Sequence, residues 1–247
     1  MNDTESGMCG QCDQVSQRLS RRRALGASLA FAGAASLTPW RARAAVGPGA
    51  PNAIPPAAAL ARIIEGNIRY AANAPMNCDG SAGRAERADA QYPIAAIVSC
   101  ADSRVTPERI FDQGPGQLFV TRVAGNFVDP GGLASLEYGV KYLGVKLIVV
   151  LGHSNCGAIA AAIKVLKDGA SLPGHLPALV ADLKPGVQPV IDHKPKDLLA
   201  EAIRGNVRYN VAQLQAAQPI VAASVASGAV KVVGGVYDIA SGKVALL

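Results

Sequence analysis

The sequence predicts an α/β fold in which helices flank a mostly parallel central β-sheet. Two short apolar runs, residues 94–98 and 147–151, are typical of strands that are buried on both faces of such a sheet. Around them, apolar residues recur at helical spacing, so strands and helices alternate along the chain. The 247 residues suffice for one domain with a substantial core once an N-terminal leader is set aside.

Residues 1–44 are predicted to be an export leader. Arg21, Arg22 and Arg23 precede an alanine-rich apolar stretch, and Ala42-Arg-Ala44 offers small residues for cleavage. The paired arginines indicate a bacterial twin-arginine signal, so we expect a periplasmic or secreted protein. The alternative is a basic, disordered tail on a cytosolic protein. Nothing after the leader approaches the ~18 apolar residues of a membrane span, so no stable span is expected once it is cleaved.

A helical arm is predicted after a short linker. Residues 45–56 are rich in Pro, Gly and Ala without periodicity, which predicts a flexible linker before a domain over residues 57–247. Pro55 and Pro56 then open a helix. Its apolar residues repeat at helical spacing and form one stripe, made of Leu60, Ile63, Ile64 and Ile68. Such an arm needs a surface to cover, on its own domain or on a second subunit.

The next elements alternate between strand and helix. We expect, in order, a strand at 94–98, a short helix from 107, a strand at 118–123, a helix at 133–143 and a strand from 146. A further helix opens near Asn155. This order predicts a sheet that is covered on both faces.

The alternation of strands and helices is interrupted at the start of the C-terminal third. Residues 168–196 contain five prolines, which predicts an irregular excursion around at most one short helix near 178–183. A long helix at about 196–217 then leads to a strand at 230–237. A Ser-Gly turn at 241–242 predicts a closing hairpin.

Charge and cysteine content argue against a nucleic-acid-binding protein and against a protein stabilised by disulfides. The formal charge is +6, but six arginines against three acidic residues place +3 of it in residues 1–44. The remainder forms no basic stripe, so no nucleic-acid partner is expected. Cys9 and Cys12 lie in the leader and would be removed with it. The odd number left, Cys78, Cys100 and Cys156, argues against stabilisation by disulfides in an oxidising compartment.

Two short motifs predict a zinc site. Cys100-Ala-Asp102-Ser-Arg104 and His153-Ser-Asn-Cys156 each follow one of the apolar strands directly. Zinc binds Cys sulfur and His nitrogen, and a catalytic site uses three protein ligands with a fourth position open. Cys100, His153 and Cys156 fit that number. They are expected at the carboxyl edge of the sheet, where crevices form, with Cys156 in the first turn of a helix that favours the thiolate.

At these residues the chain resembles the β-class carbonic anhydrases. Further matches surround the two motifs: Arg62-Ile-Ile-Glu-Gly-Asn67 with Tyr70, the segment 115–126, Ser135-Leu-Glu-Tyr-Gly139 and Gly234-Gly-Val-Tyr-Asp238. The resemblance spans about residues 57–247. It implies reversible hydration of CO₂ to bicarbonate and a proton by zinc-bound hydroxide, with one Zn²⁺ per subunit. It also implies a homodimer or a dimer of dimers, in which the N-terminal arm wraps the second subunit.

The resemblance gives Asp102 and Arg104 catalytic roles. Asp102 accepts the proton of the zinc-bound hydroxide in a hydrogen bond and aims its lone pair at CO₂, while Arg104 keeps the carboxylate charged and rotated correctly. In some members of the family this aspartate closes the site as a fourth zinc ligand. That subgroup carries Trp three positions before the first zinc cysteine. Ile97 stands there in this chain, so an open site is favoured although Arg122 matches an arginine of the subgroup's bicarbonate site.

Several alternatives stay open at this point. The substrate could be a sulfur analogue such as carbonyl sulfide or carbon disulfide, or the chain could be a non-catalytic zinc-binding protein that Asp102 closes. His175 and His193 are not assigned as proton shuttles. Four apolar residues either line a CO₂ pocket or belong to the core, namely Val105, Phe111, Phe119 and Val123. Because two thiolates neutralise Zn²⁺, activity is expected to rise toward alkaline pH.

Overall fold

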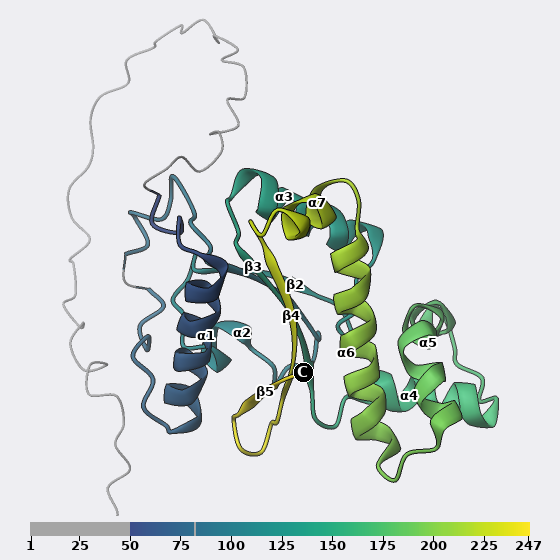
Figure 1. Cartoon of the computed structure of the whole chain (residues 1–247). Helices are drawn as coiled ribbons and strands as arrows, with labels where there is room; N and C mark the ends of the chain where they lie inside the picture. Colours follow the sequence, from purple (N-terminus) through teal and green to yellow (C-terminus); the bar gives the residue numbers. More distant parts are fainter. Residues whose placement is uncertain (1–49, 82) are drawn as a thin grey trace, which may run out of the picture. The chain divides into compact units, whose positions relative to one another are not determined.

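The computed structural model describes residues 50–81 and 83–247 (Figure 1). The predicted leader and the first part of the linker lie outside the described residues. The sheet has the strand order β2-β1-β3-β4-β5. Its strands are β1 (Ala95–Ser99), β2 (Leu118–Arg122), β3 (Leu147–His153), β4 (Lys231–Tyr237) and β5 (Val244–Leu246). The first four are parallel and β5 pairs antiparallel with β4 as the expected hairpin, so the predicted mostly parallel α/β fold is confirmed.

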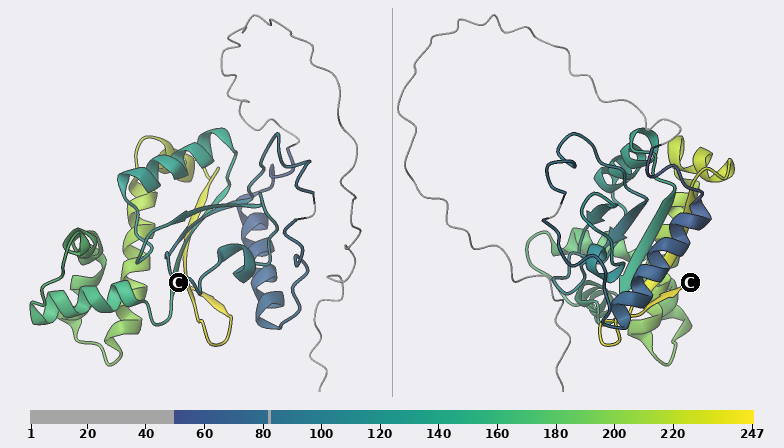
Figure 2. Two further views of the ribbon diagram at one scale, coloured as in Figure 1. Left: turned by 180° about the vertical axis from the view of Figure 1, so that it is seen from behind. Right: turned by 90° about the vertical axis from the view of Figure 1, so that its left-hand side faces the viewer.

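Helices cover both faces of the sheet. In β1, Ile97 points to one apolar cluster and Val98 to the other, as the pleat requires. The first cluster is covered by α1 (Pro56–Ala71) and α2 (Pro107–Ile110), and the second by α3 (Pro130–Tyr142), α6 (Leu198–Ala216) and α7 (Ile220–Ala226). Figure 2 shows α1 and α6 on opposite sides of the strands. Burial on both faces explains why these strands are apolar throughout.

The α1 helix packs on its own domain. Ile63 is fully buried in the core, and the Asn67 side chain donates hydrogen bonds to the carbonyl oxygens of Ile110 (3.0 Å) and Gly242 (2.9 Å). On the outer side, Ile68 is 63% exposed. The wrapping of a second subunit by this arm stays a prediction.

The described end of the expected linker is held at Asn52. This side chain is fully buried, and its amide donates to the carbonyl oxygens of Pro93 (2.9 Å) and Leu143 (2.7 Å). Pro93 lies just before β1, and Leu143 lies between α3 and β3, so residue 52 is fixed at the amino edge of the sheet. Within the described residues, no helix has the length and hydropathy needed to cross a bilayer.

The chain reverses direction between β1 and β3. From β1 it moves outward to β2, and it then crosses back through α3 to β3 on the other side of β1. In sheets of this order, ligands bind in the crevice beyond the carboxyl ends of the strands at that reversal. Cys100 directly follows β1 and His153 is the last residue of β3, so both lie at the switch point.

The prediction of an irregular excursion over 168–196 is wrong in its main part. The segment contains an 18-residue helix, α5 (Leu176–His193), with Pro185 and Pro189 inside it. Each internal proline costs about 3 kcal/mol, but both lie on the exposed face, where water can bond the carbonyls they leave free. The opposite face is buried, at about 1.5–3 kcal/mol per large side chain, and comprises Val180, Leu183, Gly186 and Val187.

Two smaller differences concern helix ends. The helix expected near Asn155 is α4 (Gly157–Asp168), so Cys156 is its N-cap residue and does not lie in the first turn. The short α7 helix was not predicted. Pro219 directly before it and Gly228 shortly after it, with φ of 72°, are boundary signals that could have indicated it.

Candidate metal centre

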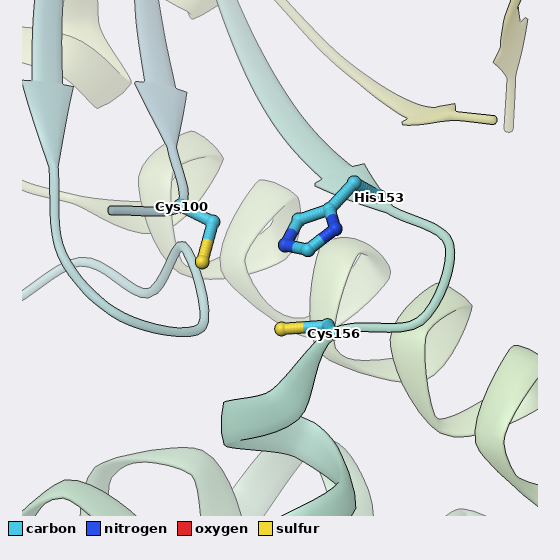
Figure 3. A group of neighbouring side chains, drawn as sticks. All are labelled: Cys100, His153 and Cys156. Carbon is cyan, nitrogen blue, oxygen red and sulfur yellow. The ribbon is translucent and has the colours of Figure 1, made fainter. Parts of the chain in front are cut away.

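The structure brings the three predicted ligands together. The ligand atoms of Cys100, His153 and Cys156 all lie within 4.8 Å of one another, and the side chains point toward a common centre (Figure 3). They come from the residue after β1, the end of β3 and the N-cap of α4. All three residues are buried, with exposed fractions of 4%, 0% and 1%.

The His153 ring presents a free lone pair to this centre. Its Nδ1 lies 2.9 Å from the Ser154 carbonyl oxygen, which assigns the ring proton to Nδ1. The Nε2 atom is buried and has no hydrogen-bond partner among the described residues. A buried polar atom without a partner costs about 1–3 kcal/mol, and a metal ion at the centre would satisfy it. The histidine therefore fits the role of a ligand.

The electrostatics of the cluster favour a cation. Burial acts to lower the pKa of His153, but the neighbouring Cys100 sulfur and the Ser154 carbonyl outweigh it and raise that pKa. The contact with Cys156 lowers the pKa of Cys100 to about 4 despite burial, and the same contact raises the pKa of Cys156. Of the two thiols, Cys100 is thus the more easily ionised. A soft dication bound between them would stabilise both thiolates.

Two backbone amides support the Cys100 sulfur. The amide nitrogens of Asp102 and Gly125 lie 3.4 and 3.3 Å from the Cys100 Sγ and donate to it. Hydrogen bonds of this kind orient a ligand and tune the metal it binds. Gly125, which belongs to the matching segment 115–126, therefore contacts a predicted ligand directly.

Asp102 and Arg104 form a planar fork at the edge of the cluster. Arg104 donates from Nε to Oδ1 (2.9 Å) and from Nη2 to Oδ2 (2.7 Å), and its backbone nitrogen also donates to Oδ1 (3.0 Å). These hydrogen bonds hold the pKa of Asp102 well below its usual range. Oδ2 lies 3.9 Å from Nε2 of His153, so the carboxylate borders the ligand cluster without joining it. This is the arrangement expected of an open site, and its persistence with metal bound stays a prediction.

Arg122 has a role that the sequence did not predict. Its Nε donates to the Cys100 carbonyl oxygen (3.0 Å) and its Nη2 to the Asp102 carbonyl oxygen (2.7 Å). The guanidinium thus fixes the backbone of a ligand and of the neighbouring carboxylate. The parallel register pairs Ser99 with Arg122. Arg122, the last residue of β2, therefore lies beside Cys100, which directly follows β1.

The four apolar residues considered for a pocket divide between core and surface groove. Val105 and Phe111 are 0% and 1% exposed in the core cluster under α1, so core packing accounts for them. Phe119 packs against the opposite face of the sheet. Val123, with Arg122, lines a groove of about 260 Å³ that none of the three ligands reaches.

Fold and site together define a class: an α/β protein with a mostly parallel sheet and, at its switch point, a buried Cys-His-Cys cluster that is compatible with zinc. Comparison with known proteins gives the family. The family model described as "Carbonic anhydrase" matches residues 95–244. "Carbonic anhydrase 2" of Mycobacterium tuberculosis is 40% identical over 195 residues, which are 77% of this chain and 92% of that relative. A carbonic anhydrase of Mycolicibacterium smegmatis is 38% identical over 193 residues, covering 77% and 93%.

Solved structures agree with the sequence relatives. The Coccomyxa β-carbonic anhydrase in complex with acetazolamide is 32% identical, with a TM-score of 0.59 over 76% of this chain and 86% of that one. A tetrameric β-carbonic anhydrase of Sordaria macrospora is 29% identical, with a TM-score of 0.60 over 66% and 84%. The chain belongs to the carbonic anhydrase family of enzymes, and within it to the β class.

Proposed function

We propose that this chain catalyses the zinc-dependent, reversible hydration of CO₂ to bicarbonate and a proton. The observation that carries the proposal is the buried Cys100–His153–Cys156 cluster, in which Nε2 of the histidine lacks a partner. These three residues would hold one Zn²⁺. When bound, the ion supplies a Lewis acid that lowers the pKa of a coordinated water enough for it to attack an electrophile near neutral pH.

The carboxylate of Asp102 orients the reacting water. Arg104 donates to both carboxylate oxygens of Asp102 and so fixes the rotation of the carboxylate. A carboxylate held in this way accepts a hydrogen bond from the reacting water. That hydrogen bond orients the water so that a lone pair of the water oxygen points at CO₂. The side chain of Asp102 is 16% exposed while that of His153 is fully buried, so the carboxylate stands between the ligands and solvent.

The test is stopped-flow CO₂ hydration by the zinc-loaded full-length chain, scanned over about pH 6.5 to 9. Hydration should be fast, dependent on zinc and faster at alkaline pH, and Cys156→Ser should abolish it. Absence of hydration at every pH with zinc fully bound would contradict the proposal. Turnover of carbonyl sulfide or carbon disulfide by that same sample would then assign the site to a sulfur-containing substrate.

We also propose self-association, as a homodimer or a dimer of dimers. The tetrameric Sordaria macrospora relatives support it, and the exposed Ile68 on α1 offers a contact beyond the chain's own core. Removal of residues 57–70 tests the arm by light scattering: a smaller particle supports wrapping of a second subunit, provided that circular dichroism shows retained helix. Ile68→Glu is a milder test, because it leaves the buried face of α1 intact. An unchanged particle size would argue against the arm.

Export by the twin-arginine route is proposed from the sequence of residues 1–44. Replacing Arg21 and Arg22 by lysine keeps the charge and removes the arginine pair. Cell fractionation should find the unaltered chain outside the cytoplasm and the lysine variant inside it. Equal distribution of the two chains would refute this localisation.

A further inference from the structure

A chain of hydrogen bonds links helix α6 to the sulfur of Cys100. Asn206 lies on the buried side of α6, is 1% exposed, and donates from Nδ2 to the carbonyl oxygen of Gly125 (2.8 Å). The amide nitrogen of the same glycine donates to the Cys100 Sγ (3.3 Å). One side chain outside the metal cluster therefore holds the residue that contacts a predicted ligand.

A second buried amide strengthens this support. Asn210, one helical turn after Asn206 and 2% exposed, accepts a hydrogen bond from the Val128 backbone nitrogen through Oδ1 (2.9 Å). Its Nδ2 donates to the Asn206 carbonyl oxygen (2.9 Å) and to Asn206 Oδ1 (3.2 Å). The two asparagines thus fasten both ends of the segment 125–128, and the second orients the first.

Gly125 needs such external support because its own torsions are permissive. Its φ is +88°, a conformation that favours glycine. A Cβ at this position would lie 2.8 Å from Leu183 Cδ2, so α5 limits the segment from the other side. Gly125 thus lies between Leu183 of α5 and Asn206 of α6, with its N–H on the Cys100 sulfur.

We propose that Asn206 is a positioning residue for the metal centre: it holds the Gly125 N–H on Cys100 and thereby limits the charge that this thiolate donates to the metal. The inference rests on the proposed zinc function. An amide that donates to a metal-bound sulfur withdraws electron density from it, which is a known way for proteins to tune a centre. Because two thiolates would otherwise neutralise the ion, this hydrogen bond leaves it a stronger Lewis acid.

Two variants of the full-length chain remove the support. Asn206→Ala deletes the donor, and Asn206→Asp keeps the shape but places a carboxylate oxygen against the Gly125 carbonyl. Asn52→Ala is the matched control, because Asn52 is equally buried and its amide also donates to backbone carbonyls, but at the amino edge of the sheet. All three changes should lower stability, and only the Asn206 changes should alter the centre.

The first readout is the thiolate-to-metal charge-transfer absorption of the cobalt(II)-loaded protein. A thiolate that loses its amide donor gives up electrons more easily, so the band should move to longer wavelength in both Asn206 variants and stay in place in Asn52→Ala. The second readout is amide hydrogen exchange of Gly125 in the metal-free protein. It should be about five- to tenfold faster in the Asn206 variants than in Asn52→Ala, as expected for the loss of one net hydrogen bond.

The outcomes separate this inference from the proposed function. A wild-type protein without a cobalt–thiolate band would overturn the metal centre and this inference with it. A wild-type band that both Asn206 variants leave unchanged, or that Asn52→Ala moves equally, would overturn the positioning role alone. Amide hydrogen exchange of Gly125 that is no faster in the metal-free Asn206 variants than in Asn52→Ala would also overturn the positioning role alone. If Asn206→Ala fails to fold, Asn206→Asp and the milder Asn210→Ala carry the test with the same expected directions.

Discussion

Arg104→Ala should reduce CO₂ hydration by loss of orientation and should leave the charge of Asp102 unchanged near neutral pH. The substitution removes two side-chain hydrogen bonds to Asp102, at 2.9 and 2.7 Å, and leaves only the one from the backbone nitrogen of residue 104. The pKa of Asp102, held low by Arg104, then rises toward the ordinary value of about 3.9. At pH 6.5 and above the carboxylate is still ionised.

The expected loss is therefore nearly independent of pH. A carboxylate free to rotate no longer fixes the reacting water, and misplacement of a reacting group by about 1 Å costs on the order of 100-fold in rate. Arg104→Lys keeps the positive charge but cannot form the planar fork, so it should recover only a small part of the rate. Arg204→Ala is the control, because Arg204 pairs with Glu201 on the surface of α6 and should have wild-type activity.

The assay is stopped-flow hydration from about pH 6.5 to 9, with the zinc content of each sample measured in parallel. Three results would refute the reasoning. Loss of zinc from Arg104→Ala would make Arg104 a structural support of the ligands. Full activity in Arg104→Lys would show that charge alone suffices. A loss confined to the acid end of the range would mean that Arg104 acts by keeping Asp102 ionised.

Three further predictions follow from the site and its surroundings. Cys156→Ser should lose zinc, measured by metal analysis after dialysis, because the hydroxyl is a poorer ligand than a thiolate. Asp112→Asn should lower the free energy of unfolding by about 2–4 kcal/mol in urea, because the buried carboxylate accepts from Arg69 and two backbone amides. Since the native pKa of Asp112 is lowered, its stabilisation is complete above about pH 4 and is lost as pH falls through that native pKa; Asp112→Asn should flatten this loss. Gly152→Ala should cost about 1–3 kcal/mol, because the added Cβ would lie 2.7 Å from Val207 Cγ2. The double variant with Val207→Ala should be more stable than the sum of the two single changes predicts.

Local patterns sufficed for most of the fold. The strands β1 and β3 are continuous apolar runs because both faces of the sheet are covered. Such runs predict buried strands from the sequence alone. The α5 helix could not be predicted in the same way. Its prolines argue against a helix locally, and only the burial of residues such as Leu183 in the finished fold offsets them.

In the site, too, some residues could be predicted from local sequence, while others depend on contacts with distant parts of the chain. Cys100 and His153 could be predicted as partners because each directly follows or ends an apolar strand, and parallel strands bring their carboxyl ends to one edge. The roles of Arg122 and Asn206 depend on contacts with residues 22 and 81 positions away in the chain. Neither belongs to a motif with a metal-ligand pattern, so no local pattern predicts either contact. The residues that we propose tune this centre are thus set by strand register and helix packing, while two of the three proposed metal ligands, Cys100 and His153, are set by the ends of strands.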